Sequence, residues 1–156
     1  MDARSRVLAT ASLSALLALV AQFLLGMAVN LFVRIPADHP GAKPSEYFSG
    51  VAQSVAWAIS AGPLLLRLHA VFGLVLVGGS IYMVVQGIGT RRGGLVAATA
   101  LGFVGTLGAG FNGGSFLNYN ENLSSMLMAV GFAVALIAYL FALYYSLQAP
   151  PSRQPA

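Results

Sequence analysis

Long apolar stretches alternate with short polar segments along this chain. The first stretch covers residues 7–33 and contains no charged side chain. Three more follow at about residues 63–86, 95–111 and 126–147, and apolar side chains dominate each of them. A helix needs roughly 20 apolar residues to cross the hydrocarbon core of a bilayer. The pattern therefore predicts four membrane-spanning helices.

The composition favours an integral membrane protein. Of the 156 residues, 58% are hydrophobic and only 8% are charged, whereas about 25% of the residues of a soluble domain are charged. The mean hydropathy is +0.80. No internal repeat or long linker divides the chain, so we expect one all-α membrane domain over residues 1–156, folded as a four-helix bundle. Cysteine is absent, which excludes disulfides and thiolate metal sites.

The longest connection, residues 34–62, follows the first span. Three prolines within its first eleven residues prevent a continuous helix there. The rest of it is apolar but too short to span, and it carries Tyr47, Phe48 and Trp57, whose rings favour the headgroup level of a membrane. We expect a short interfacial helix in this first outer loop, and an ordinary ordered loop is the alternative.

The basic residues predict how the chain is oriented. The side richer in Arg and Lys stays in the cytoplasm, and five arginines fall on the side of the termini: Arg4, Arg6, Arg91, Arg92 and Arg153. The other side has only two basic residues, with three acids beside them. We therefore expect a multi-pass protein of the cell membrane with both termini cytoplasmic.

The first span has a second interpretation, and the distribution of basic residues bears on whether the protein binds nucleic acid. A basic start, an apolar core and the small residues Gly26 and Ala28 also fit a cleaved signal peptide, although the apolar run is long for one. The basic residues occur singly or in pairs at the ends of apolar runs. This distribution argues against nucleic acid as a partner.

Small residues recur along one face of the third span. Ala98, Gly102, Gly105 and Ala109 follow at steps of four, three and four, which places them on the same side of a helix. Small residues let helix backbones approach closely within lipid. We expect this face to pack tightly against a neighbouring helix, and we expect the Asn-rich residues 112–125 to form a polar outer loop.

Polar side chains near the spans gather in the outer half of the predicted bundle. An unpaired amide or imidazole in hydrocarbon costs several kcal/mol, so these groups should turn toward one another. Arg67 has an alternative, because a long basic side chain near a helix end can reach the headgroups instead. We hypothesise an outer ligand-binding pocket lined by Gln22, Asn30, Arg67, His69, Asn112 and Glu121.

His69 is the only histidine within a predicted span, and hence the only in-span candidate for a metal or haem ligand. A six-coordinate haem would need a second ligand, which Met126 or Met128 could supply, although methionines in spans usually fill the core. The structural alternative is a histidine that bonds to Gln22 or Asn112 and fixes helix packing.

Three functions remain open. A non-enzymatic membrane subunit or interaction protein fits the small-residue face and the scarcity of ionisable groups, and its partners would be the bilayer and other membrane subunits or a second copy. The alternative is a haem- or quinone-binding redox protein that uses His69. A small transporter or channel is the third, although no predicted span carries an acidic residue.

Overall fold

A computed structural model describes residues 3–148 of the chain, and this part contains no β-strand. Four of its helices are long and apolar enough to cross a membrane, which confirms the predicted all-α, four-span bundle. The five helices are α1 (Ala3–Phe32), α2 (Tyr47–Ser60), α3 (Leu64–Gly89), α4 (Gly93–Tyr119) and α5 (Asn122–Leu147).

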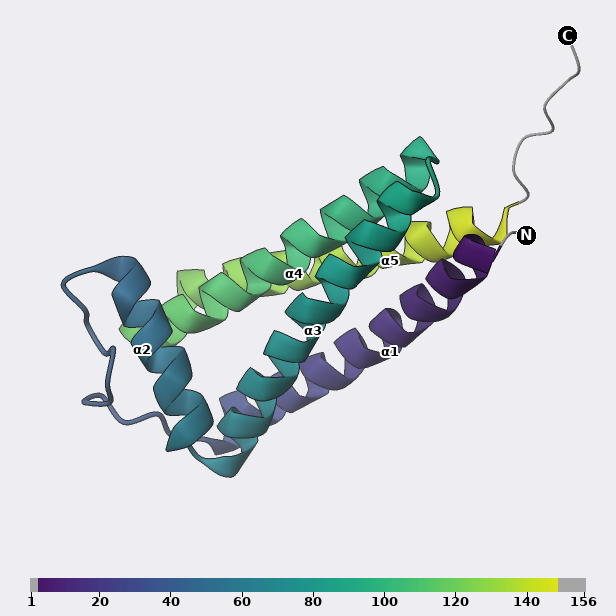
Figure 1. Cartoon of the computed structure of the whole chain (residues 1–156). Helices are drawn as coiled ribbons and strands as arrows, with labels where there is room; N and C mark the ends of the chain where they lie inside the picture. Colours follow the sequence, from purple (N-terminus) through teal and green to yellow (C-terminus); the bar gives the residue numbers. More distant parts are fainter. Residues whose placement is uncertain (1–2, 149–156) are drawn as a thin grey trace, which may run out of the picture.

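The four long helices run side by side, and α2 lies across one end of them (Figure 1). Helix α1 contacts α3 and α5, α4 contacts the same two helices, and α2 rests on α3 and α4. The start of α1 and the end of α5 lie at the opposite end of the bundle (Figure 1). We refer to the two ends as the α2 end and the terminal end.

Helices α4 and α5 make the closest pair because glycines stand where they cross. A Cβ atom at Gly105 would lie 2.7 Å from the backbone nitrogen of Ala135 and from the carbonyl oxygen of Gly131. In turn, a Cβ atom at Gly131 would lie 2.8 Å from the backbone nitrogen of Ala109. The ring of Tyr139 occupies the space beside Gly102. The small-residue face of α4 is therefore the face that meets α5, and Ala98 is buried near its start.

The polar loop predicted over residues 112–125 is wrong, because most of that segment is helical. Helix α4 continues to Tyr119 and α5 begins at Asn122. The side chain of Asn112 donates to the Gly108 carbonyl of its own helix at 2.8 Å, so it does not disturb the helix. Only Asn120 and Glu121 form the turn, and Asn120 takes the left-handed conformation with φ 53° that asparagine tolerates better than most residues.

The helix predicted in the first outer loop is present as α2. Its N-terminus is capped by the carboxylate of Glu46, which accepts hydrogen bonds from the amides of Phe48 at 2.9 Å and Ser49 at 2.6 Å. At its other end, Arg67 donates to the carbonyl oxygens of Ser60 and Gly62. Both ends of α2 are thus held by side chains.

The hydrogen bonds that Glu46 accepts at the N-terminus of α2 give a prediction for acid pH. The Ser49 amide, followed by that of Phe48, lowers the pKa of Glu46 from its usual 4.5. A carboxyl group with a lowered folded pKa stabilises the fold above its unfolded pKa, and this contribution is lost as the pH falls through the folded value. We therefore expect the first turn of α2 to be intact at neutral pH and to fray below about pH 4.5. Amide exchange of Phe48 and Ser49 measures the effect.

Glu46→Gln is the control for that prediction. Its side chain cannot ionise, so exchange of the same two amides should show no transition in the acid range beyond the intrinsic dependence of exchange on pH. An identical acid transition in this variant would assign the effect to another group.

Candidate functional site

Two side chains of the hypothesised pocket meet inside the bundle, Gln22 on α1 and His69 on α3. The Gln22 Nε2 atom donates to the backbone carbonyl of His69 at 3.1 Å and lies 3.5 Å from the Nε2 atom of its ring. Two glycines leave room for the pair: a Cβ atom at Gly26 would lie 2.9 Å from His69 Cε1, and one at Gly73 would lie 3.2 Å from Gln22 Nε2. The pair therefore bridges α1 and α3 within the spans.

One atom on each of these side chains is buried without a hydrogen-bond partner in the described part of the chain: Gln22 Oε1 and His69 Nδ1. The Gln22 amide donates toward His69 Nε2, which places the ring proton on Nδ1. The pair thus holds one buried acceptor and one buried donor. Leaving such atoms unpaired costs about 1–3 kcal/mol each, so a water molecule or a small ligand would stabilise the site.

The other four residues of the hypothesised pocket lie elsewhere. Asn30, Arg67 and Glu121 are exposed, and Asn112 bonds only to its own helix. Within residues 3–148 no ion pair joins Arg67 to Glu121, since the guanidinium instead caps α2. In the same range no three His, Cys, Asp or Glu side chains gather where they could hold a metal. Of the six residues, the structure brings together Gln22 and His69, and ligand binding there stays a prediction.

A second polar cluster, which the sequence did not suggest, lies at the α2 end. We define the cap as residues 34–62, which comprise the proline-rich loop and α2. Three buried side chains fasten it to the bundle: His39 from the loop, Ser54 from α2 and Asn118 from the last turn of α4. Ser54 Oγ lies 2.6 Å from the Asn118 side chain and donates to the Pro40 carbonyl at 3.4 Å. The loop, α2 and α4 are therefore joined by one polar network.

Asn118 lies at the centre of this network. With its amide nitrogen turned toward the cap, it donates to the carbonyl oxygens of Gly41 and Gly50, each 3.1 Å away, and its oxygen accepts from the Val51 amide at 3.2 Å. Its backbone carbonyl also accepts from the Lys43 amide at 2.9 Å. One residue of α4 thus satisfies backbone groups of both the loop and α2, which buried polar groups require.

His39 fastens the loop at a second point. Its Nε2 atom lies 3.1 Å from the Leu117 carbonyl of α4, and its Nδ1 atom lies 2.9 Å from the Pro40 carbonyl. The ring stacks on that of Trp57 in α2, with centroids 4.3 Å apart and planes 13° from parallel. The His39 ring therefore contacts the loop, α2 and α4 at once.

The loop backbone can approach α2 because of one glycine. Gly41 has a φ of 87°, and the hydroxyl group of Ser54 occupies the space that a Cβ atom there would need. A residue with a side chain would be strained at this φ and would push the loop away from α2. The cap is therefore a packed structure with its own buried polar interior.

The chain thus has two polar sites, the Gln22–His69 pair within the spans and the His39–Ser54–Asn118 cluster beneath the cap. The first offers hydrogen bonds that the described residues do not fill, and the second holds residues 34–62 against α4. In comparisons with protein-family models, curated proteins and solved structures, nothing matches this chain.

Proposed function

We propose that this protein is a non-enzymatic membrane subunit that presents its cap to a partner protein. The observation that supports this proposal is the buried network of His39, Ser54 and Asn118, which holds 29 residues of connection in one arrangement. A fixed surface outside the spans suits recognition, because a partner need not order it on binding.

The exposed face of α2 is the proposed contact surface. Its members are uncharged: Ser49, Gln53, Ala56 and Ser60 are exposed and recur at steps of four, three and four. The Gln53 amide bonds to the Ser49 hydroxyl at 2.9 Å, so part of this face is already ordered. Such a face favours a partner that offers neutral hydrogen-bonding groups rather than a charged one.

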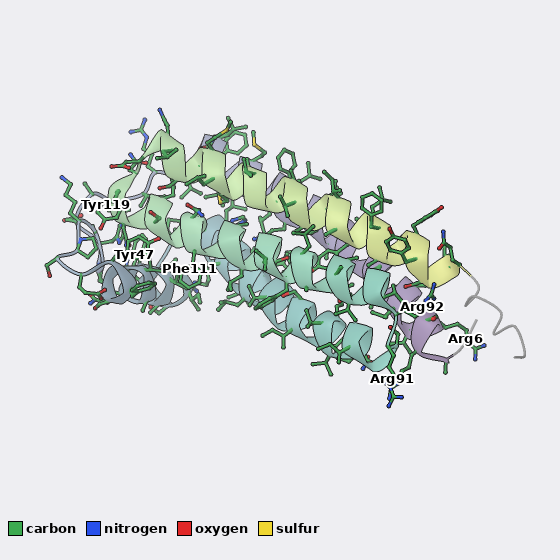
Figure 2. The ribbon with its side chains drawn as sticks, turned by 90° about the horizontal axis from the view of Figure 1, so that it is seen from above. Arg6, Tyr47, Arg91, Arg92, Phe111 and Tyr119 are labelled. Atoms are coloured by element: carbon green, nitrogen blue, oxygen red, sulfur yellow. The ribbon has the colours of Figure 1, made fainter. Side chains whose placement is uncertain are left out.

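In this proposal the cap lies outside the cytoplasm and both termini lie within it, at the cell membrane. Arg6, Arg91 and Arg92 all lie at the terminal end, opposite the aromatic residues Tyr47 and Phe111 (Figure 2). The rule that cytoplasmic segments are rich in Arg and Lys supports this orientation, because the described terminal end has four arginines and no acid, whereas the α2 end has three basic residues and three acids. Arg153, which contributed to the same expectation, lies outside the described residues.

Site-specific photo-cross-linking in native membranes tests the proposed function. A photoreactive residue placed at Gln53, on the exposed face of the cap, should yield a discrete protein adduct. The same residue at Val75, an exposed apolar position on α3, is the matched control and should react with lipid. The adduct should also disappear from an Asn118→Ala background, in which the exposed face is unchanged but the cap is released. An adduct that persists there, or none at position 53, would contradict the proposal.

A small-molecule site at Gln22 and His69 is a second candidate function, favoured by their two unpartnered atoms. A quinone fits the pair better than haem does. Its carbonyl oxygen would accept from His69 Nδ1–H, while the Nε2 atom, through which histidine usually binds haem iron, faces the Gln22 amide. The Gln22 Oε1 atom would accept a hydrogen bond from the hydroquinone form.

This second candidate predicts stabilisation by a soluble quinone. Adding decylubiquinone should raise the Tm of the wild-type protein in detergent and leave that of a Gln22→Leu variant unchanged, because the variant lacks the acceptor and its amide no longer orients His69. Equal shifts in the two proteins would indicate nonspecific partitioning and would contradict the site. A Soret band in the purified protein would instead support haem.

A further inference from the structure

A groove opens between α1 and α3 toward the terminal end. Near the α2 end these helices are joined through Gln22 and His69. Farther along, α3 leaves α1 and approaches α4 (Figure 1), where Thr99 occupies the space that a side chain at Gly87 would need. The resulting groove is shallow and widely open, and it is lined by Arg6, Val7, Thr10, Ala11 and Tyr82.

The polar residues of the groove lie at two depths. Thr10 follows Arg6 by one helical turn, about 6 Å along the axis. Thr10 is seven residues from the start of α1 and Tyr82 is seven residues from the end of α3, so each lies about 10 Å from its helix end. The two ends lie near each other, because the Arg4 guanidinium occupies the space beside Gly89. A cation at the mouth is thus followed by two hydroxyl groups at a common depth.

Past Tyr82, the exposed face of α3 continues toward the middle of the helix. Gly78 lies one turn farther along the same face of α3. No atom lies within 4 Å of the position that a Cβ atom would occupy there, so the backbone is bare. The remaining side chains of the wall, Val7 and Ala11, are apolar. Beyond the hydroxyl groups the groove therefore suits a hydrocarbon chain.

We propose that this groove binds one anionic diacyl phospholipid. Its phosphate would pair with Arg6, its ester carbonyls would accept from the Thr10 and Tyr82 hydroxyl groups, and an acyl chain would pass Ala11 toward Gly78. Charge supports an anionic headgroup. Arg6, Arg91 and Arg92 lie at this end (Figure 2) without any acid of the described chain, whereas Arg34, Lys43 and Arg67 at the α2 end are matched by Asp38, Glu46 and Glu121. A second copy would bring its own arginines to the same level, where like charges repel.

Native mass spectrometry of the detergent-purified protein tests this inference, with equimolar dioleoylphosphatidylglycerol and dioleoylphosphatidylcholine added. We expect one phosphatidylglycerol to be retained in preference to phosphatidylcholine. Arg6→Gln should weaken that preference about fivefold, the factor that corresponds to about 1 kcal/mol per basic residue near an anionic surface. Arg91→Gln is the matched control at the same end but outside the groove lining, and it should leave the preference unchanged.

A second arm tests the hydroxyl groups. Wild-type protein should retain ester-linked phosphatidylglycerol better than its ether-linked analogue, which lacks the carbonyl acceptors, and a Thr10→Val/Tyr82→Phe double variant should lose that distinction. Both side chains are exposed, so the variant should remain folded. Equal retention of the two headgroups by wild type, equal effects of the two arginine variants, or a protein dimer without lipid would each overturn the inference.

Discussion

The Gly105→Leu variant is expected to lose much of its thermal stability in detergent. A Cβ atom at this position would lie 2.7 Å from backbone atoms of Ala135 and Gly131, and backbone atoms cannot rotate away as a side chain can. Helices α4 and α5 would have to move apart. The close contact that small residues make possible in lipid would then be lost. We expect a cost of about 3 kcal/mol or more, at the upper end of overpacking effects. Thermal unfolding followed by circular dichroism measures it.

Gly108→Leu provides the matched control for this substitution. Gly108 belongs to the same helix, but nothing lies within 4 Å of the position of its Cβ atom. The added side chain would enter open space, and the Tm should change little. If the two variants were equally stable, the close crossing of α4 and α5 would not be what holds the bundle together.

The Asn118→Ala variant is expected to release the cap from the bundle. The substitution removes the two hydrogen bonds that the amide nitrogen can donate among Gly41, Gly50 and Ser54, and the one that its oxygen accepts from Val51. Gly50 and Val51 keep their backbone bonds within α2, whereas the Gly41 carbonyl of the loop loses its partner. Unpaired buried groups cost about 1–3 kcal/mol each, so we expect a total loss of about 2–4 kcal/mol after partial rehydration. Chymotrypsin should then cleave at Tyr47 and Phe48 much faster than in wild type, because the unfastened cap samples extended conformations.

Asn112→Ala is the corresponding control, since it removes an amide from the same helix. Its side chain bonds only to the Gly108 carbonyl, which also remains within the backbone ladder of α4. We expect a change below about 1 kcal/mol and an unaltered rate of cleavage in the cap. Equal rates of cleavage in the two variants would show that the cap is not fastened by Asn118.

The features that local pattern determines were predictable from the sequence. A bilayer requires long apolar helices, so four spans followed from the four apolar stretches. The helical repeat placed Gly102 and Gly105 on one face, and that is the face of α4 that meets α5. The end of α4 was not predicted, because the segment with Asn112 and Gly114 resembles a turn. The segment stays helical because the side-chain amide of Asn112 bonds within the helix and because Gly114 makes room for Val51 of α2.

Which side chains meet at the candidate sites could not be predicted from the spacing of residues along the chain. Depth along a span suggested that Gln22, Asn30 and His69 lie in the same half of the bundle, but depth does not determine which way a side chain points, and Asn30 is exposed. The cap network was missed because its partners are distant in sequence: Ser54 and Asn118 are separated by 64 residues, and His39 and Leu117 by 78. Only the crossing of α2 over α4 brings them together.

The central claim is that the cap is a packed surface held in place for recognition. Hydrogen exchange of the cap amides in lipid nanodiscs tests this claim most directly. The Lys43 amide donates to the backbone carbonyl of Asn118 and the Val51 amide donates to its side chain, so each is expected to exchange far more slowly than in an unfolded chain. Both amides should lose this protection in Asn118→Ala, because release of the cap as a whole separates Lys43 from α4 and exposes α2. If both amides exchanged in the wild-type protein at the rate of an unfolded chain while α4 remained protected, the cap would be a mobile loop and the account would be contradicted.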